Sequence, residues 1–279
     1  MRIDFHTHTF PARIAAPAIA KMQASCHAAA FLDGTGPALT VSLQKAGLDR
    51  AVVLPVATNP AKVQSMNDLS LRLTGHDGLL YFGCIHPDQP DWRQELDRIA
   101  AAGLRGIKLH PVYQGVDFDD VRYLRILERA GELGLIVVTH AGDDIGFPGV
   151  VRCSPAMIAR ACRQVGRVPL VLAHMGGWKN WDEVMELLPD TGVYLDTAFS
   201  LGRITPLEPD DYTSRELQLL DAAAFCNMVR RFGSERILFG TDSPWTDQAA
   251  SVAQIEALPL TQAEKDAILG GNAQRLLGL

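Results

Sequence analysis

Short apolar runs alternate with longer amphipathic stretches along this chain. Several runs are rich in β-branched residues and do not alternate with polar positions, which is typical of strands buried on both faces of a parallel sheet. Eight such runs predict strands at Ile3–Phe5, Ala51–Val56, Leu79–Ile85, Leu104–Leu109, Leu135–Thr139, Pro169–Ala173, Gly192–Asp196 and Ile237–Phe239.

The stretches between these runs have the spacing of helices. Val121, Leu124 and Leu127 recur every three residues and therefore share one helical face. The segment Thr261-Gln-Ala-Glu264 is a capping-box signature, in which the threonine and the glutamate satisfy backbone N–H groups at the start of a helix. It predicts a C-terminal helix from Gln262 to Leu277.

Eight strands separated by helices predict an α/β fold of the (β/α)8 TIM barrel type, as one domain over residues 1–279. Such barrels typically have about 250 residues. The alternative, an open doubly wound sheet, would carry a glycine-rich turn after the first strand, but here Phe5 is followed by His-Thr-His. Two long connections, Phe10–Leu48 and Ala198–Arg236, are expected to rise over the active face.

Composition narrows the choice of partners. The chain carries 26 Lys and Arg against 32 Asp and Glu, and no basic stripe indicates nucleic-acid binding. No run approaches the ~20 apolar residues of a membrane span. The chain begins without a charged and then apolar leader, and its five cysteines form no CxxC pair, so a cytoplasmic protein is expected. The expected partner is a small-molecule substrate, and a homodimer is the working expectation for the assembly.

Histidines mark the ends of the predicted strands. In a TIM barrel, catalytic residues sit at the carboxyl ends of the strands. Six of the eight histidines fall at or just after the carboxyl end of a predicted strand: His6, His8, His86, His110, His140 and His174. Of these, His86 is followed by a proline and is expected to have a structural role.

His6-Thr7-His8 follows the first predicted strand. Side chains two residues apart on a strand point the same way, so both imidazoles can meet one metal ion. The alternative is one core histidine and one solvated histidine. Because further histidines end other strands of the same barrel, the pattern favours metal ligation by both.

His140, His174 and Asp242 follow the fifth, sixth and eighth predicted strands. Each histidine can instead be a hydrogen-bonded loop residue, and the aspartate can cap the next helix. Beside the HxH pair, all three are interpreted as site residues, and Asp242 is placed to bind a metal ion and to take a proton from water. Asp143 and Asp144 are expected to cap or solvate a loop.

Lys108 and His110 form a second pair on one face of a strand. A lysine inside a barrel is costly unless it is paired or used. Three functional interpretations compete: Lys108 pairs with a substrate, carries a carbamate that bridges two metal ions, or forms a Schiff base. The structural alternative is a pair with Asp196. Tyr113 and Trp178 also follow strand ends, where they can line a substrate pocket or simply pack.

With these motifs in place, the chain resembles the amidohydrolase superfamily and, within it, the branch called amidohydrolase family 2. That branch includes relatives of aminocarboxymuconate semialdehyde decarboxylase, and the superfamily includes dihydroorotase-like hydrolases. The matching segments run in order along nearly the whole chain: Ile3–His8, Gly106–Pro111, Thr139–Gly142, Leu172–Gly177, Tyr194–Thr197, Leu238–Trp245 and Gly270–Gly278.

The resemblance implies a barrel, a divalent metal, usually zinc, and activation of water. His174 resembles a histidine that is catalytic in one-metal members and a second-metal ligand in two-metal members. Lys108 matches in spacing the lysine that is carbamylated in dihydroorotase-like members. Asp242 resembles both a ligand and the general base. The residues that resemble metal ligands are His6, His8, His140 and Asp242.

The expected function is therefore that of a metal-dependent hydrolase, with one or two divalent ions, Zn²⁺ before others, cleaving an amide, ester or lactone of a small, carboxylated substrate. Two alternatives stay open. The first is metal-dependent decarboxylation of a small carboxylic acid, and the second is a metal-free Schiff-base lyase built on Lys108. The residues expected to bind substrate are Lys108, His110, Tyr113 and Trp178.

Overall fold

The computed structural model describes residues 1–279 and contains nine short strands, each parallel to its neighbours. Each strand overlaps one of the eight predicted runs, and Phe82 divides the third run into two strands. The strands are β1 (Ile3–Thr7), β2 (Arg50–Val53), β3 (Leu79–Tyr81), β4 (Gly83–Cys84), β5 (Gly106–Leu109), β6 (Ile136–Thr139), β7 (Leu170–Leu172), β8 (Tyr194–Asp196) and β9 (Ile237–Leu238).

The strands close into a barrel. Their order is β1-β2-β3 in one sheet and β4-β5-β6-β7-β8-β9 in the other, and only Phe82 separates β3 from β4. At the other junction, the backbone N–H of Phe5 donates to the carbonyl of Phe239 at 2.7 Å, which joins β1 to the end of β9. The predicted (β/α)8 barrel is therefore confirmed.

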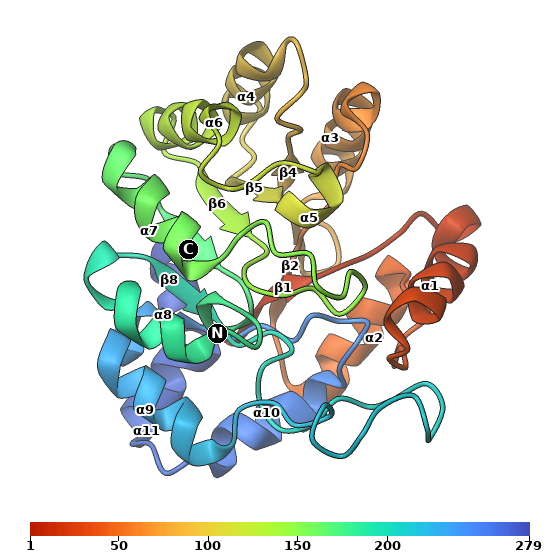
Figure 1. Ribbon diagram of the computed structural model, residues 1–279. Coiled ribbons are helices and arrows are strands. Elements are labelled where there is room, and N and C mark those ends of the chain that lie inside the picture. The colour runs from red at the N-terminus through yellow and green to blue at the C-terminus, as the bar shows by residue number, and fades with distance from the viewer.

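Helices surround the strands, as Figure 1 shows. Several helices begin at a residue whose side chain caps the first turn. Asp221, for example, precedes α9, and its side chain accepts the backbone N–H of Ala224. None has the length and apolar character needed to cross a bilayer. The helices are α1 (Ala12–Cys26), α2 (Gly36–Ala46), α3 (Val63–Leu73), α4 (Trp92–Ala101), α5 (Pro111–Gln114), α6 (Val121–Glu132), α7 (Pro155–Gln164), α8 (Trp181–Leu187), α9 (Ala222–Phe232), α10 (Gln248–Ala257), α11 (Gln262–Asp266) and α12 (Asn272–Leu277).

The C-terminal helix departs from the prediction. The capping box at Thr261 and Glu264 is present, but the predicted helix is divided into α11 and α12 by a wide turn at Ala267–Gly271. At this turn the backbone of Gly270 lies against Met1, where a Cβ atom would overlap the carbonyl oxygen of Met1. The interruption thus coincides with two consecutive glycines, and Gly270 allows close contact with the other end of the chain.

The interior of the barrel has an apolar layer near the amino ends of its strands. Two residues of α12 close this layer from below. Its buried members, here called the apolar layer, are Ile3, Phe5, Val52, Leu54, Phe82, Ile136, Val138, Val171 and Leu238, with Ala273 and Leu277 of α12.

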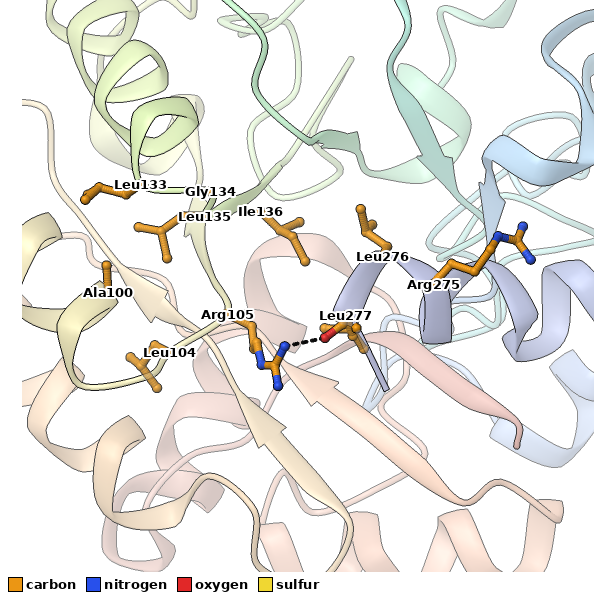
Figure 2. A pocket seen from close by; sticks show the side chains of 11 residues that line it. Ala100, Leu104, Arg105, Leu133, Gly134, Leu135, Ile136, Arg275, Leu276 and Leu277 are labelled. Carbon is orange, nitrogen blue, oxygen red and sulfur yellow. Dashed lines mark hydrogen bonds between the residues drawn. The ribbon is translucent and has the colours of Figure 1, made fainter.

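A small pocket of about 240 Å³ lies at this closed end, and Figure 2 shows the residues that line it. A guanidinium nitrogen of Arg105 donates to the carbonyl of Leu277 at 2.6 Å and so fastens α12 beneath the barrel. The lining contains no histidine and no acid. This end of the barrel is therefore built for packing, and the chemistry must lie at the other end.

The two long connections meet over the open end, as expected. Residues 26–31, after α1, and residues 198–220, after β8, together form what we call the roof. Its two halves are joined by a bridge between Ala28 and Pro206 and by the backbone N–H of Leu207, which donates to the carbonyl of His27 at 2.8 Å. Trp178, from outside the roof, packs with Phe199 and other apolar residues of the roof and so attaches it to the barrel mouth.

Candidate metal centre

The predicted site residues converge in the mouth of the barrel. Five of the six strand-end histidines form one continuous series of ring contacts. The ring centroids are 5.1 Å apart for His8 and His6, 5.4 Å for His6 and His174, 4.9 Å for His174 and His140, and 4.4 Å for His140 and His110. The sixth, His86, stands outside the series and accepts the backbone N–H of its near neighbour Asp88.

An irregularity in β1 turns two consecutive side chains into the barrel. The pairing of β1 with β2 shifts register between Asp4 and Thr7. Phe5 belongs to the apolar layer, whereas His6, the next residue, reaches Asp196 in the polar region above it. A bulge of this kind re-aims a side chain. Here it brings the imidazole of His6 into the mouth.

His6, His8 and Asp242 form a tight group of potential metal ligands. Nε2 of His6 lies 3.2 Å from Nε2 of His8, and Oδ1 of Asp242 lies 3.4 Å from the first and 3.2 Å from the second. Two ligands of a tetrahedral zinc ion, each bonded at about 2.0–2.1 Å, stand roughly 3.3 Å apart. The spacing of these three atoms therefore matches that of ligands that share one metal ion.

Hydrogen bonds decide which nitrogen of His6 and His8 carries the proton. Nδ1–H of His6 donates to Oδ2 of Asp196 at 2.7 Å, and Nδ1–H of His8 donates to the carbonyl of Leu54 at 2.8 Å. Because a neutral imidazole carries one proton, Nε2 of each ring is left bare. Both bare nitrogens face the same point in the mouth.

The same reasoning shows which nitrogen carries the proton in His174 and in His140. Nδ1–H of His174 donates to the carbonyl of Ala198 at 2.8 Å, and Nε2–H of His140 donates to the carbonyl of Asp143 at 3.0 Å. Nε2 of His174 and Nδ1 of His140 are therefore bare, and they lie 3.1 Å apart. Metal-bound histidines typically have their other ring nitrogen held by an oxygen in this way.

Bare nitrogens that face each other at 3.1 and 3.2 Å repel through their lone pairs, so the arrangement favours a cation beside each pair. Imidazole nitrogens with one carboxylate oxygen are a donor set that suits zinc and other borderline divalent metals. The residues present in the mouth therefore fit a divalent metal ion.

Burial keeps the imidazoles of His6, His140 and His174 neutral, as metal ligation requires. It lowers the pKa of His140 to about 4 and that of His174 to about 4, and it lowers the pKa of His6 well below its usual value. Burial alone would raise the pKa of Asp242, but its contacts with His8 and the nearby His6 and His174 outweigh that effect and lower it. At neutral pH the cluster thus combines neutral imidazoles with an ionised carboxylate.

Lys108 is fully buried in the barrel beside this cluster. Its Nζ lies 3.2 Å from Nε2 of His6, so a lysine N–H can donate to the bare nitrogen. Burial lowers the pKa of Lys108 to about 8, although the charges of Asp196 and Asp242 act to raise it. Lys108 therefore faces the ligand cluster itself, where its charge can meet an anionic group of a substrate.

Asp196, at the end of β8, positions two histidines from different strands. Besides accepting Nδ1–H of His6, it accepts the backbone N–H of His174 at 3.0 Å and that of Ala198 at 3.1 Å through Oδ1. Burial raises its pKa to about 6, against the lowering effects of His174 and Lys108. The sequence left this residue ambiguous, and the structure places it directly behind the ligands.

Asp4 ties the first strand to the last, and the sequence analysis assigned it no role. Its carboxylate accepts the backbone N–H of Thr241 at 3.0 Å, the hydroxyl of Thr241 at 2.6 Å and the side-chain amide of Gln248 at 2.6 Å. These bonds hold His6 and Asp242, which follow closely in each segment, side by side. An acid inside an otherwise apolar strand run was the signal that could have found it.

Asp144, expected to cap or solvate a loop, is buried. Its Oδ1 accepts the backbone N–H of Gly146, as in a capped turn, but its Oδ2 lies 3.6 Å from Nε2 of His110 and 3.8 Å from Nε2 of His140. Because Nε2–H of His140 already donates to the carbonyl of Asp143, these three residues do not offer a second complete set of ligands. Asp144 instead supplies a negative charge beside His110, whose buried Nδ1 has no partner.

His174 and Asp242 share an unusual backbone conformation. Their φ angles are 60° and 61°, in the left-handed region that residues other than glycine seldom adopt. Local hydrogen bonds maintain it, since Asp196 accepts the backbone N–H of His174 and the carbonyl of His6 accepts that of Asp242. Strain of this kind concentrates at functional sites, which supports the placement of both residues in the site.

The ligand cluster opens into a cavity of about 1190 Å³. The four residues expected to bind substrate, Lys108, His110, Tyr113 and Trp178, all line it. Tyr113 packs edge-on against the ring of His110 with centroids 4.4 Å apart, and the indole N–H of Trp178 donates to the carbonyl of Phe199. The cavity therefore joins the candidate metal ligands to an aromatic wall.

Comparison with known proteins places this fold and site in a family. The model of the amidohydrolase family matches residues 3–279, so the chain belongs to the amidohydrolase family, as its motifs indicated. It is thus a member of an enzyme family. A comparison with curated proteins finds no matching relative.

Several solved structures are similar over the whole chain. They include 5-carboxyvanillate decarboxylase from Sphingomonas paucimobilis, with a TM-score of 0.70, 15% identity and coverage of 100% of this chain and 99% of that chain. A putative 2-pyrone-4,6-dicarboxylic acid hydrolase from Pseudomonas putida has a TM-score of 0.64, 18% identity and coverage of 99% and 97%. An amidohydrolase from Burkholderia multivorans with bound zinc has a TM-score of 0.70, 16% identity and coverage of 100% and 99%. At these identities the likeness shows a shared fold.

Proposed function

We propose that this protein is a metal-dependent hydrolase that cleaves an amide, ester or lactone of a small, carboxylated substrate. The observation that carries the proposal is the set of four histidine nitrogens, each left bare by its hydrogen bonds, that gather in the mouth with the carboxylate of Asp242. Membership of the amidohydrolase family and the zinc in the similar structure from Burkholderia multivorans support it.

The residues that would hold the metal ion, for which we propose zinc, are His6, His8, His140 and Asp242. When bound, a divalent ion acts as a Lewis acid that lowers the pKa of a water toward about 7 and polarises a carbonyl group. Manganese, iron or cobalt can also bind these donors, but the mixed nitrogen and oxygen set suits zinc best. If a second ion binds, His174 and a carbamylated Lys108 would complete its site.

The protein's own residues move the proton. Asp242, ionised at neutral pH, takes the proton of the attacking water as the hydroxyl group bonds to the carbonyl carbon. As the bond to the leaving nitrogen or oxygen breaks, Asp242 returns that proton to the leaving atom. His174, whose Nε2 is bare, accepts a hydrogen bond from the attacking water and orients it toward the carbonyl carbon.

Four other residues orient the substrate in this proposal. Lys108 binds a substrate carboxylate through its buried charge next to His6. His110 offers an unpartnered, buried Nδ1, and the aromatic faces of Tyr113 and Trp178 enclose the substrate ring or chain. A small anionic substrate suits this combination of a cationic floor and an apolar wall.

The first test counts metal ions per chain by elemental analysis of the purified protein, beside a variant with His6→Ala and His8→Ala. We expect stoichiometric metal in the parent and its loss from the variant. A count near one supports a single-metal site, and a count near two supports carbamylated Lys108. Absence of metal after reconstitution with zinc or manganese would refute the proposal and favour the Schiff-base alternative, which borohydride trapping on Lys108 would then reveal.

The second test separates metal binding from proton transfer. Asp242→Asn should retain much of the metal, held by three histidines, but lose turnover by about 10²–10⁴-fold, the usual contribution of a general acid–base. Asp143→Asn is the matched control, because Asp143 lies in the same mouth and holds His140 only through its backbone carbonyl. Full activity of Asp242→Asn would remove Asp242 from the mechanism.

Decarboxylation is the second candidate. It is favoured by the position of Lys108, whose Nζ at 3.2 Å from Nε2 of His6 would bring a substrate carboxylate to the ligands themselves. The similar structure of 5-carboxyvanillate decarboxylase also supports it. Release of CO₂ with no consumption of water, measured on small aromatic and unsaturated acids, would favour this reaction over hydrolysis.

A further inference from the structure

The cavity at the candidate site is larger than a small substrate requires. Pockets for drug-sized ligands measure about 300–1,000 Å³, and this one measures about 1190 Å³. One part surrounds the metal ligands. The other part, here called the side arm, continues past His8 between the start of α1, the start of α2 and α3, and is lined by Ile14, Pro37, Met66, Leu69 and Leu73.

The side arm exists because the ring of helices is open at this place. α2 packs against α10, and α3 packs against α4. In Figure 1, α1 lies at the right-hand edge of the molecule, outside the helices that cover the barrel. Only three of its 15 residues are buried, Ala15, Ile19 and Cys26. Helix α1 thus forms a wall of the side arm without filling it.

The roof directs the cavity toward the side arm. Residues 26–31 and 198–220 are bonded to each other above the mouth, where Phe199 of the roof packs against Trp178. A substrate longer than the mouth therefore has room along α3. The hydroxyl of Tyr81, which pairs with that of Thr9 at 3.0 Å, stands in the cavity lining between the ligands and the apolar residues of α3.

The walls of the side arm favour an apolar occupant. Ile14 is 43% exposed and Leu73 is 37% exposed, and both line the same cavity. Covering such surface is favourable by roughly 25 cal/mol per Å². Three cationic side chains, Arg13, Lys62 and Arg72, and one acidic side chain, Asp77, stand around the side arm and are exposed. The excess of positive charge suits a ligand that carries negative charge.

We propose that the side arm binds the apolar part of an elongated substrate, an acyl chain or comparable hydrocarbon, whose carboxyl or carbonyl end is processed in the mouth. This inference rests on the proposed function for the reacting end alone. It names the substrate class as amphipathic acids, esters or lactones with an apolar tail.

The test measures binding of butyrate and octanoate to the metal-loaded, full-length protein by isothermal titration calorimetry. Each buried methylene should tighten binding roughly fourfold. Octanoate has four more methylenes than butyrate, so full burial of all four would tighten binding about 250-fold, and burial of only part of them should still give at least about 30-fold. Equal affinity for the two carboxylates would overturn the proposal.

Two leucines with the same exposure provide a matched pair of variants. Leu73 ends α3 in the side arm, and Leu187 ends α8 outside the cavity, and each is 37% exposed. Leu73→Asp should weaken octanoate binding about tenfold and leave butyrate binding unchanged, whereas Leu187→Asp should change neither. Ile14→Asp tests the opposite wall in the same way. Identical behaviour of Leu73→Asp and Leu187→Asp would refute the side arm as a binding site.

Two further measurements isolate this inference. Asp242→Asn, which the proposed function makes inactive, should keep the preference for octanoate, so loss of hydrolysis and loss of tail binding can be told apart. Sedimentation velocity examines the rival occupant, a second copy of the chain. A dimer that Leu73→Asp converts to monomer, with no preference for octanoate, would replace the substrate tail by a subunit interface.

Discussion

The two layers inside the barrel are built from opposite kinds of residue. The apolar layer, from Ile3 to Leu277, is closed by α12 and fastened by the bond from Arg105 to the carbonyl of Leu277. The layer above it consists of buried histidines, Lys108 and Asp196. Both layers are made of buried side chains, and yet only the upper one holds groups that can be charged.

This difference between the layers shows that the upper layer holds the ionisable groups, whereas the lower layer stabilises the fold. Burying ionisable groups is costly unless they are bonded to one another, and the upper layer meets this cost with bonds such as that from His6 to Asp196. It also holds His174 and Asp242 in left-handed conformations. The lower layer has no such constraint, so its close packing can stabilise the fold that the upper layer needs.

The largest expected effect is on stability and comes from the lower layer. Phe82 is fully buried, lies edge-on to Phe5 with ring centroids 5.9 Å apart, and separates β3 from β4. Phe82→Ala should lower the free energy of unfolding by about 3–5 kcal/mol, because it leaves a cavity in the core. Chemical denaturation measures this loss, and metal stoichiometry of the folded variant should stay that of the parent.

A matched control shows whether burial is the cause. Phe31 is 47% exposed in the roof, and Phe31→Ala should change the free energy of unfolding by no more than about 0.5 kcal/mol. If Phe82→Ala also removed the metal from protein that remains folded, the two layers would not be separable and the comparison would fail.

The upper layer should show the opposite pattern. Asp196→Asn removes the carboxylate that holds the proton on Nδ1 of His6. The proton can then occupy Nε2, which makes that nitrogen less available to a metal ion. Loss of such a partner typically weakens metal binding by about 10–100-fold. Competition with a chelator measures this affinity, and Asp143→Asn serves again as the carboxylate-to-amide control. An unchanged affinity in Asp196→Asn would mean that His6 does not need its partner.

The local sequence pattern predicted the strands of the barrel and the start of α11. Apolar runs predicted the strands because a strand buried on both faces must be apolar along its length, and capping signatures predicted the start of α11. The HxH pair predicted that His6 and His8 meet, and their Nε2 atoms are 3.2 Å apart. These features depend on residues that are near one another in the sequence.

What the sequence did not predict depends on contacts between distant segments. The role of Asp4 requires Thr241 and Gln248, and that of Asp144 requires the fold to bring His110 beside it. The close approach of Gly270 to Met1 likewise joins the two ends of the chain. No periodicity within a single segment records such partners, so they emerge only when the barrel is closed.

The smallest expected effect lies outside both layers, at the start of α6. Asp120 caps this helix, and hydrogen bonds from the side chain and backbone of Arg122 lower its pKa to about 2. Since its pKa is lower in the folded protein, its contribution is present above about pH 4 and is lost as pH falls through about 2. An exposed pair of this kind contributes about 0.5 kcal/mol.

Asp120→Asn, which keeps the cap, should therefore be less stable than the parent by that amount in urea at pH 5, and the difference should shrink steadily toward pH 2. A difference that stays constant over this range would show that the charge of Asp120 does not contribute to stability, and either result leaves metal binding in the upper layer unchanged.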